Sequence, residues 1–325
     1  MTYKIVCLDV HAPEVREIMQ SMVPEGFQLE MANSYGEEEQ MRLAREADFI
    51  MAGWAPVPDK MIRSAKNLKL IQKWGIGYDK IAIETARELN IPVAIAAGSN
   101  AIPVAELTVG LMLCVYRKVP YVDRNLRTGR WLKTEMRGQS YMLCGKTIGL
   151  IGLGAIGKRV AKLVRCFEPR LQYYDIVKVS PDEAEELGVE YREFDDLLTT
   201  SDILSLHVPL TPETRGFIGK EQFLKMKRGA IIINTSRGGI IKEDDLIWAL
   251  KEGIIAGAGL DVFETEPPLP SNPLLTMDNV VLTSHIGGGV LDNVANVTRH
   301  AFGNMQKIIS GKPLTERDIV IRKIS

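Results

Sequence analysis

The chain has 325 residues, of which 46% are hydrophobic and 25% charged, and its formal net charge is -1. This length predicts about two domains with substantial cores. The near-zero charge and an aromatic content of 6% argue against nucleic acid and anionic membranes as partners, and no apolar run approaches the length of a transmembrane helix.

Apolar runs alternate with helical patterns through the first hundred residues. The predicted strands cover residues 3–9, 28–32, 49–52, 70–73 and 91–94, with helical patterns over 12–22, 36–46, 59–64 and 81–89. Such alternation predicts a parallel sheet with helices on both faces. We expect residues 1–99 plus 290–325, including a last helix over 292–309, to form a discontinuous, flavodoxin-like substrate (catalytic) domain.

A long apolar helix is predicted over residues 102–121, and a basic, less periodic arm follows it to residue 144. The arm could be a solvated loop or a contact between subunits, and its residues alone leave both readings open. Strands and helices then alternate from residue 147 to 283. The fold class is therefore α/β, with residues 100–289 expected to form a Rossmann domain of roughly six parallel strands in a doubly wound sheet.

A glycine motif organises this second domain. The stretch Thr147–Asp175 reads as a strand, the turn Gly152-Leu-Gly154-Ala-Ile-Gly157, a helix, and a second strand that ends on an acid. In such a turn the first glycine permits a sharp bend, the second allows a pyrophosphate to approach the backbone, and the third lets helix and strand pack closely. Asp175 can hold ribose hydroxyls and would repel a 2′-phosphate, so the sequence predicts NAD rather than NADP.

The four cysteines lie in or beside apolar runs and lack the spacing of a metal site, so they are predicted to be buried free thiols. Free thiols are typical of the reducing cytoplasm. The N-terminus reads as a strand and lacks the apolar region of a signal peptide. We therefore expect a cytoplasmic protein without a metal centre.

Polar residues follow the later strands, where open α/β sheets bind their ligands. His285 follows a strand and precedes three glycines, so it could exchange a proton with a carbonyl oxygen. A carboxylate beside an imidazole would orient it, and either Glu264 or Glu266 could supply that carboxylate. Arg237 follows another buried strand and could bind a substrate carboxylate through two hydrogen bonds.

Taken together, the motifs resemble the D-isomer-specific 2-hydroxyacid dehydrogenase family, phosphoglycerate dehydrogenases included. The resemblance covers nearly the whole chain and is strongest from residue 100 to 288. The matching segments are Gly75–Asp79, Val104–Thr108, Gly152–Gly157, His207–Thr211, Asn234–Gly238, Asp261–Phe263 with Glu266-Pro267, and Ser284–Gly288.

This resemblance implies an NAD-dependent oxidoreductase that interconverts a small D-2-hydroxy acid and its 2-keto acid, of the 3-phosphoglycerate, glyoxylate/hydroxypyruvate or D-lactate type. It implies the catalytic set Arg237, Glu266 and His285, which favours Glu266 over Glu264, and substrate contacts from the backbone of Ile76 and Gly77. Family members are usually dimeric through the helix and arm, so a homodimer is expected. The predicted cofactor contacts are Thr108, Gly152, Gly154, Ala155, Ile156, Gly157, Asp175, His207, Val208, Pro209, Thr214, Thr235, Ser236, Asp261, Gly287 and Gly288.

Lys73 stands near a place where phosphoglycerate dehydrogenases often carry arginine, so it could bind a second anionic group of the substrate, or be a plain surface lysine. Two other readings remain open at this point. The chain could be an NAD(H)-sensing binding protein like the family's corepressors, or a dehydrogenase of another small anion such as phosphite. Formate is disfavoured because formate enzymes have glutamine in place of Glu266.

Overall fold

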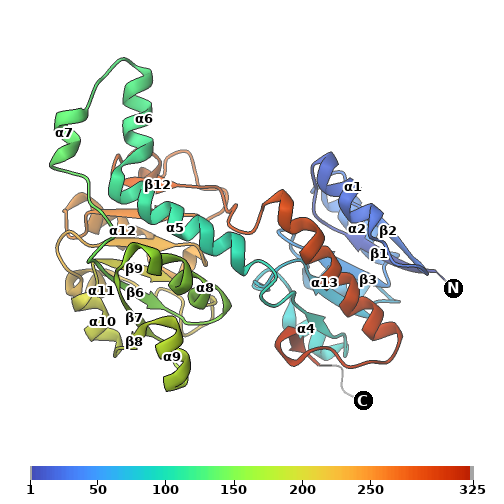
Figure 1. Cartoon of the computed structure of the whole chain (residues 1–325). Helices are drawn as coiled ribbons and strands as arrows, with labels where there is room; N and C mark the ends of the chain where they lie inside the picture. Colours follow the sequence, from blue (N-terminus) through green and yellow to red (C-terminus); the bar gives the residue numbers. More distant parts are fainter. Residues whose placement is uncertain (1, 323–325) are drawn as a thin grey trace. The chain divides into compact units, whose positions relative to one another are not determined.

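The computed structural model describes residues 2–322. The chain divides into two compact units, residues 1–100 with 288–325 and residues 101–287. Each unit is an α/β body around one sheet (Figure 1). No helix within the described residues is long and apolar enough to cross a bilayer.

The first unit holds a sheet of six strands in the order β13-β5-β4-β3-β1-β2. Its strands are β1 (Tyr3–Cys7), β2 (Phe27–Met31), β3 (Phe49–Ala52), β4 (Leu70–Lys73), β5 (Val93–Ala94) and β13 (Ile319–Ile321). Its helices are α1 (Pro13–Ser21), α2 (Glu37–Arg45), α3 (Asp59–Ser64), α4 (Ile83–Glu88) and α13 (Leu291–Ile309). The parallel strands have the 2-1-3-4-5 order of flavodoxin-like folds, as predicted, and the antiparallel β13 is an addition that the sequence reading missed.

Alternate residues of the central strands contribute to two hydrophobic cores, one on each face of this sheet. Ile5 and Cys7 of β1 pack into the cluster that contains Phe302 of α13, whereas Val6 and Leu8 pack into the cluster on the other face. Burial on both faces is typical of parallel sheets and explains the nearly continuous apolar runs in the sequence. Figure 1 shows α13 lying along the sheet beside α1.

The second unit holds seven strands in the order β12-β11-β10-β9-β6-β7-β8, one more than the rough count from the sequence. The strands are β6 (Thr147–Ile151), β7 (Arg170–Tyr174), β8 (Val189–Tyr191), β9 (Ile203–Leu206), β10 (Ile231–Asn234), β11 (Gly257–Leu260) and β12 (Val280–Leu282). All neighbouring pairs are parallel. The order reverses between β6 and β9, as in dinucleotide-binding Rossmann folds.

Helices cover both faces of this sheet. They are α5 (Ala101–Arg117), α6 (Val119–Arg127), α7 (Lys133–Arg137), α8 (Ala155–Val164), α9 (Pro181–Leu187), α10 (Phe194–Thr200), α11 (Lys220–Lys225) and α12 (Glu243–Lys251). The single long helix predicted over 102–121 is wrong. Lys118 adopts a left-handed conformation with φ 52° and separates α5 from α6. The basic arm after residue 122 is also more ordered than a loop, because it contains the rest of α6 and α7.

The burial predicted for all four thiols is only partly right. Cys7 is buried and Cys114 half-buried, whereas Cys144 and Cys166 are exposed. Cys144 lies in the segment before β6 and Cys166 in a 3-10 turn after α8. Apolar neighbours in the sequence therefore did not imply burial at the edges of this unit.

Candidate active site

The glycine turn leaves β6 where the strand order reverses, which is where open α/β sheets bind ligands. Gly152 has φ 92°, and a Cβ added there would lie 2.6 Å from the carbonyl oxygen of His207. A Cβ at Gly157 would lie 2.2 Å from the carbonyl oxygen of Gly152. Both positions therefore require glycine, because any side chain would push α8 or β9 away from the turn.

Gly154 differs from its two partners in the motif. It is exposed at the N-terminus of α8, and an added Cβ would meet no heavy atom within 4 Å. The fold itself does not need glycine here, so the open space in front of the helix is available to a ligand. Free backbone N–H groups at the start of a helix favour a phosphate in such a space, and the cradle therefore fits the pyrophosphate of a dinucleotide.

Asp175 stands at the end of β7 beside this turn. Its Oδ2 accepts a hydrogen bond from the backbone N–H of Leu153 at 2.7 Å, and its Oδ1 accepts one from Val177 at 3.1 Å. Each carboxylate oxygen keeps a further acceptor site. The Asp175 carboxylate thus stabilises the glycine turn and can still accept hydrogen bonds from ribose hydroxyls.

His207 closes the other side of the turn, directly after β9. Its Nε2 lies 2.9 Å from the hydroxyl of Ser205, and its Nδ1 is buried with no hydrogen-bond partner within the described residues. Burial lowers the pKa of His207 to about 3. The imidazole is therefore neutral at physiological pH, and the His207 backbone carbonyl lies against Gly152. Of the other predicted contacts on this loop, Val208 is half-buried and Pro209 exposed, and the Thr214 hydroxyl donates to the Pro209 carbonyl at 2.6 Å.

A buried pair of threonines joins α5 to the loop after β10. The hydroxyls of Thr108 and Thr235 lie 2.8 Å apart, and Thr108 also donates to the Val104 carbonyl. Thr108 has no exposed surface. Through the hydrogen bond to Thr235, the Thr108 side chain links α5 to the loop that leads to Arg237.

His285 and Glu266 come together at the ends of two neighbouring strands, β12 and β11. The Nδ1 of His285 lies 2.9 Å from Oε2 and 3.1 Å from Oε1 of Glu266. Glu264 instead faces Glu243, whose backbone N–H it accepts at 3.4 Å. The structure therefore brings Glu266, and not the competing Glu264, to the imidazole. Because Nδ1 is held by the carboxylate, Nε2 is the ring nitrogen left to exchange a proton with a ligand.

Asp261 holds the backbone around His285. Its carbonyl accepts the His285 N–H at 2.8 Å, and its carboxylate accepts the N–H groups of Ile286 and Gly287, each at 2.9 Å. The hydroxyl of Thr283 completes the set at 2.6 Å. Asp261 is 1% exposed, so its buried carboxylate oxygens are satisfied by the loop that carries the histidine.

Arg237 follows β10, the third strand of this edge. The loop is shaped by Asn234, whose side chain donates to the Arg237 carbonyl at 2.9 Å and accepts from the Ser236 N–H at 3.0 Å. A Cβ at Gly238 would lie 1.9 Å from the backbone carbonyl of Phe263. The loops after β10 and β11 are therefore in direct backbone contact, which brings Arg237 to the same edge as Glu266 and His285. The sequence analysis did not predict that Asn234 and Gly238 determine the conformation of this loop, because their role depends on the packing between the two loops.

The predicted substrate residues Lys73, Ile76 and Gly77 belong to the first unit, at and after the end of β4. Ile76 and Gly77 are half-buried. Lys73 is 6% exposed and its Nζ donates to the carbonyl of Gly53. It is not a surface lysine.

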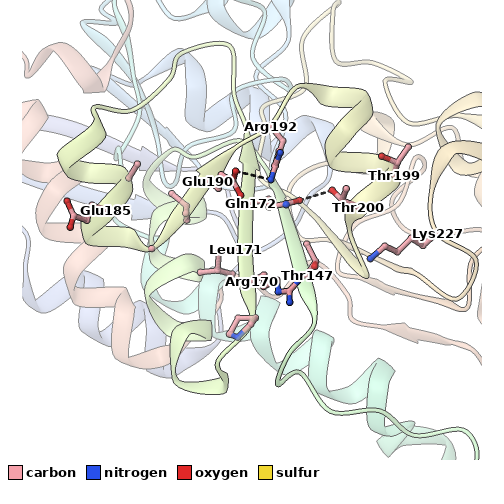
Figure 2. Close-up of a pocket in the computed structure, with 14 residues that line it drawn as sticks. Thr147, Arg170, Leu171, Gln172, Glu185, Glu190, Arg192, Thr199, Thr200 and Lys227 are labelled. Atoms are coloured by element: carbon pink, nitrogen blue, oxygen red, sulfur yellow. Dashed lines mark hydrogen bonds and ion pairs between the residues drawn. The ribbon is translucent and has the colours of Figure 1, made fainter.

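A polar groove of the second unit lies elsewhere. Its lining includes Thr147, Arg170 and Val189, the first residues of β6, β7 and β8, so it opens at the amino ends of the strands. Figure 2 shows two of its internal interactions, between Glu190 and Arg192 and between Thr200 and Gln172. This groove is on the sheet edge opposite the glycine turn and shares no residue with the predicted site.

Comparison with known proteins gives the family. Residues 109–287, more than half of the chain, match the model of the D-isomer specific 2-hydroxyacid dehydrogenase NAD binding domain. A D-3-phosphoglycerate dehydrogenase of Archaeoglobus fulgidus is 40% identical over 306 residues, which cover 94% of this chain and 58% of that protein. The chain thus spans little more than half the length of this relative.

A hydroxypyruvate reductase of Thermotoga maritima is 42% identical over 269 residues, which cover 82% of this chain and 86% of that protein. Among solved structures, an NAD-dependent formate dehydrogenase of Staphylococcus aureus in complex with NAD matches with a TM-score of 0.87 and 27% identity, over 99% of this chain and 100% of that one. The resemblance read from the motifs is thereby confirmed, as are the fold class and NAD as the cofactor of this kind of domain. The chain belongs to the D-isomer specific 2-hydroxyacid dehydrogenase family.

Proposed function

We propose that this chain is an NAD-dependent dehydrogenase that interconverts a small D-2-hydroxy acid and its 2-keto acid. The observation that carries the proposal is the contact of 2.9 Å between His285 Nδ1 and Glu266, at the sheet edge that also bears Arg237. Bound NADH supplies the hydride. His285 Nε2 donates the proton to the carbonyl oxygen in reduction and takes it back in oxidation.

Arg237 and the backbone of Ile76 and Gly77 are proposed to bind the substrate carboxylate, and a guanidinium also stabilises negative charge that develops on the carbonyl oxygen. The cofactor is proposed to lie with its pyrophosphate at Gly154, Ala155 and Ile156 and its adenosine ribose at Asp175. The open cradle at Gly154 supports the first contact, and the free acceptor sites of the carboxylate support the second.

The burial of Lys73 favours a substrate without phosphate. A lysine that is 6% exposed and donates to the Gly53 carbonyl presents little of its surface to a substrate. We therefore favour glyoxylate or hydroxypyruvate as the keto acid over 3-phosphohydroxypyruvate. NADH oxidation should be measured against these three acids, pyruvate and phenylpyruvate, with NADPH in place of NADH as the control.

We expect kcat/KM at least tenfold higher for glyoxylate or hydroxypyruvate than for 3-phosphohydroxypyruvate. His285→Ala should lower kcat by roughly 10²- to 10⁴-fold and leave NADH binding within about twofold, because the imidazole acts on the substrate. Full activity of this variant would refute the catalytic assignment. Tight NADH binding without turnover on any acid would instead favour the NAD(H)-sensing alternative.

We also propose a cytoplasmic homodimer. The segment from α6 to β6 exposes large apolar side chains, with Trp131 at 73%, Met142 at 69% and Leu126 at 52%. Apolar surface of this kind is typical of protein contacts. The free exposed thiols Cys144 and Cys166 are consistent with a reducing compartment.

A further inference from the structure

Three potential metal ligands lie together at the end of β1. Cys7 is the last residue of β1, Asp9 lies in the bend that follows it, and His11 comes two residues later. One ligand atom from each lies within 4.8 Å of the other two, and Cys7 Sγ is 3.5 Å from His11 Nε2. Sulfur and nitrogen ligands of one tetrahedral zinc ion stand about 3.5 Å apart, so two of the three already have the required separation.

The position in the fold also favours a ligand. The strand order of the first unit reverses between β1 and β3, and the cluster lies just beyond the carboxyl end of β1. Crevices at such reversals are the places where open α/β sheets bind ligands. The glycine turn of the second unit occupies the equivalent position of its own sheet.

Asp9 is fixed in place at this point. It is 3% exposed, and its carboxylate accepts hydrogen bonds from the backbone N–H groups of Trp54 at 2.7 Å, Ala55 at 2.8 Å, and Gly53. A carboxylate ligand held in this way by a second set of partners is typical of metal sites. It also loses little conformational freedom when a cation binds.

Of the two other donors, Cys7 is buried and His11 half-buried. Burial, and then the charge of Asp9, raise the pKa of the Cys7 thiol, while burial lowers the pKa of His11. A neutral imidazole is the form that ligates metals, whereas the thiol must lose its proton. Among the described residues, Arg16 is a cation whose charge acts on both groups, and its guanidinium donates to the Ala32 carbonyl at 2.8 Å.

We propose that Cys7, Asp9 and His11 form a binding site for one zinc-class divalent cation. The cation forms bonds to Sγ, to Nε2 and to a carboxylate oxygen, and the thiol proton leaves to solvent. Because Asp9 is held by backbone N–H groups, the Cys7 and His11 side chains must move toward it by about 1 Å to reach metal–ligand distances of about 2.0–2.3 Å. A water molecule takes the fourth position.

Trp74 packs against the cluster. Its ring packs against His11 with centroids 4.9 Å apart, and its buried Nε1–H has no hydrogen-bond partner within the described residues.

The spacing explains why the sequence reading predicted no metal. Familiar zinc patterns place ligands at helix or knuckle intervals, whereas these three are spaced two residues apart, from the last residue of β1 through the bend that follows it. Only the fold shows that Asp9 is held inward and that Cys7 and His11 meet.

The test is titration of the metal-free full chain with Zn²⁺, and with Co²⁺ as a spectroscopic probe, in a Cys144→Ser/Cys166→Ser background. This background removes the exposed thiols, which would bind such ions unspecifically. We expect one equivalent of Zn²⁺ to bind with release of about one proton, a thiolate-to-cobalt charge-transfer band, and a higher Tm with Zn²⁺ but not with Mg²⁺.

His11→Gln is the decisive variant because His11 is half-buried and its replacement keeps the size of the side chain. It should bind Zn²⁺ at least 100-fold more weakly, and Cys7→Ala should abolish the charge-transfer band. Tm without metal shows whether each variant is folded. The proposal is overturned if the background protein binds no equivalent of Zn²⁺, or if a folded His11→Gln variant binds it as tightly as the background does. Neither outcome bears on the dehydrogenase proposal.

Discussion

At the residue scale, the position of His285 depends on hydrogen bonds to both its backbone and its ring. Its φ of 55° lies in the left-handed region, which residues other than glycine adopt uncommonly, although histidine adopts it more often than most. A strained conformation of this kind persists only when the surroundings fix it. Here Asp261 fixes it from the backbone side and Glu266 from the ring side.

Glu266→Gln tests whether the Glu266 carboxylate supports catalysis by His285 through its negative charge. The amide can still accept from Nδ1, so the ring should stay in place while the charge that stabilises an imidazolium is lost. We expect kcat for keto-acid reduction to fall about 10- to 100-fold with KM nearly unchanged, measured as steady-state NADH oxidation. Glu264→Gln is the matched control because Glu264 faces Glu243, and equal losses in both variants would contradict the assigned role.

His207 predicts a pH dependence of stability. Its folded pKa of about 3 is below the ordinary value of about 6.5. Between these two pH values the His207 side chain is protonated in the unfolded chain but not in the folded chain. The contribution of neutral His207 to the free energy of unfolding is therefore complete above pH 6.5 and is lost as the pH falls toward 3.

Between pH 6.5 and 5 this loss amounts to about 2 kcal/mol for one such group. Urea unfolding at both pH values should show a smaller loss of unfolding free energy for His207→Gln than for the unmodified chain. The same pH dependence in both proteins would mean that His207 is protonated in the folded state after all.

At the scale of elements, the glycine motif separates what the fold needs from what the ligand needs. Gly157→Ala should destabilise the second unit by about 1–3 kcal/mol, because its Cβ would meet the Gly152 carbonyl at 2.2 Å. Gly154→Ala should leave Tm within a degree or two but weaken NADH binding, because its Cβ would enter open space in front of α8. Thermal unfolding and NADH titration of both variants separate the two effects. Equal losses of Tm would refute this division.

The sequence predicted these elements well because loops that follow parallel strands must gather at one edge. The placement of Arg237, Glu266 and His285 after β10, β11 and β12 follows from that rule alone. The structure adds what no local pattern contains, such as the backbone contact of Gly238 with Phe263 and the carboxylate of Asp261 behind the His285 loop. The break at Lys118 was missed because one left-handed residue leaves the apolar pattern of two successive helices uninterrupted.

At the scale of the whole molecule, the assembly is the property that a single chain predicts least directly. The α6–α7 segment projects from the sheet of its unit in Figure 1 and carries side chains whose exposure is costly in a monomer. A stable dimer buries on the order of 1,600 Å² in total, and large apolar anchors near its centre contribute most of the affinity.

Leu126→Glu/Trp131→Glu should therefore convert the proposed dimer into a monomer. Two carboxylates would be desolvated in the contact, at a cost of several kcal/mol each unless they find partners. Sedimentation equilibrium over a range of concentrations should give the dimer mass for the unmodified chain and the monomer mass for the variant. Leu224→Glu, at an exposed leucine of α11, is the matched control and should remain dimeric. A monomeric unmodified chain, or a variant that still sediments as a dimer, would place the contact elsewhere or remove it.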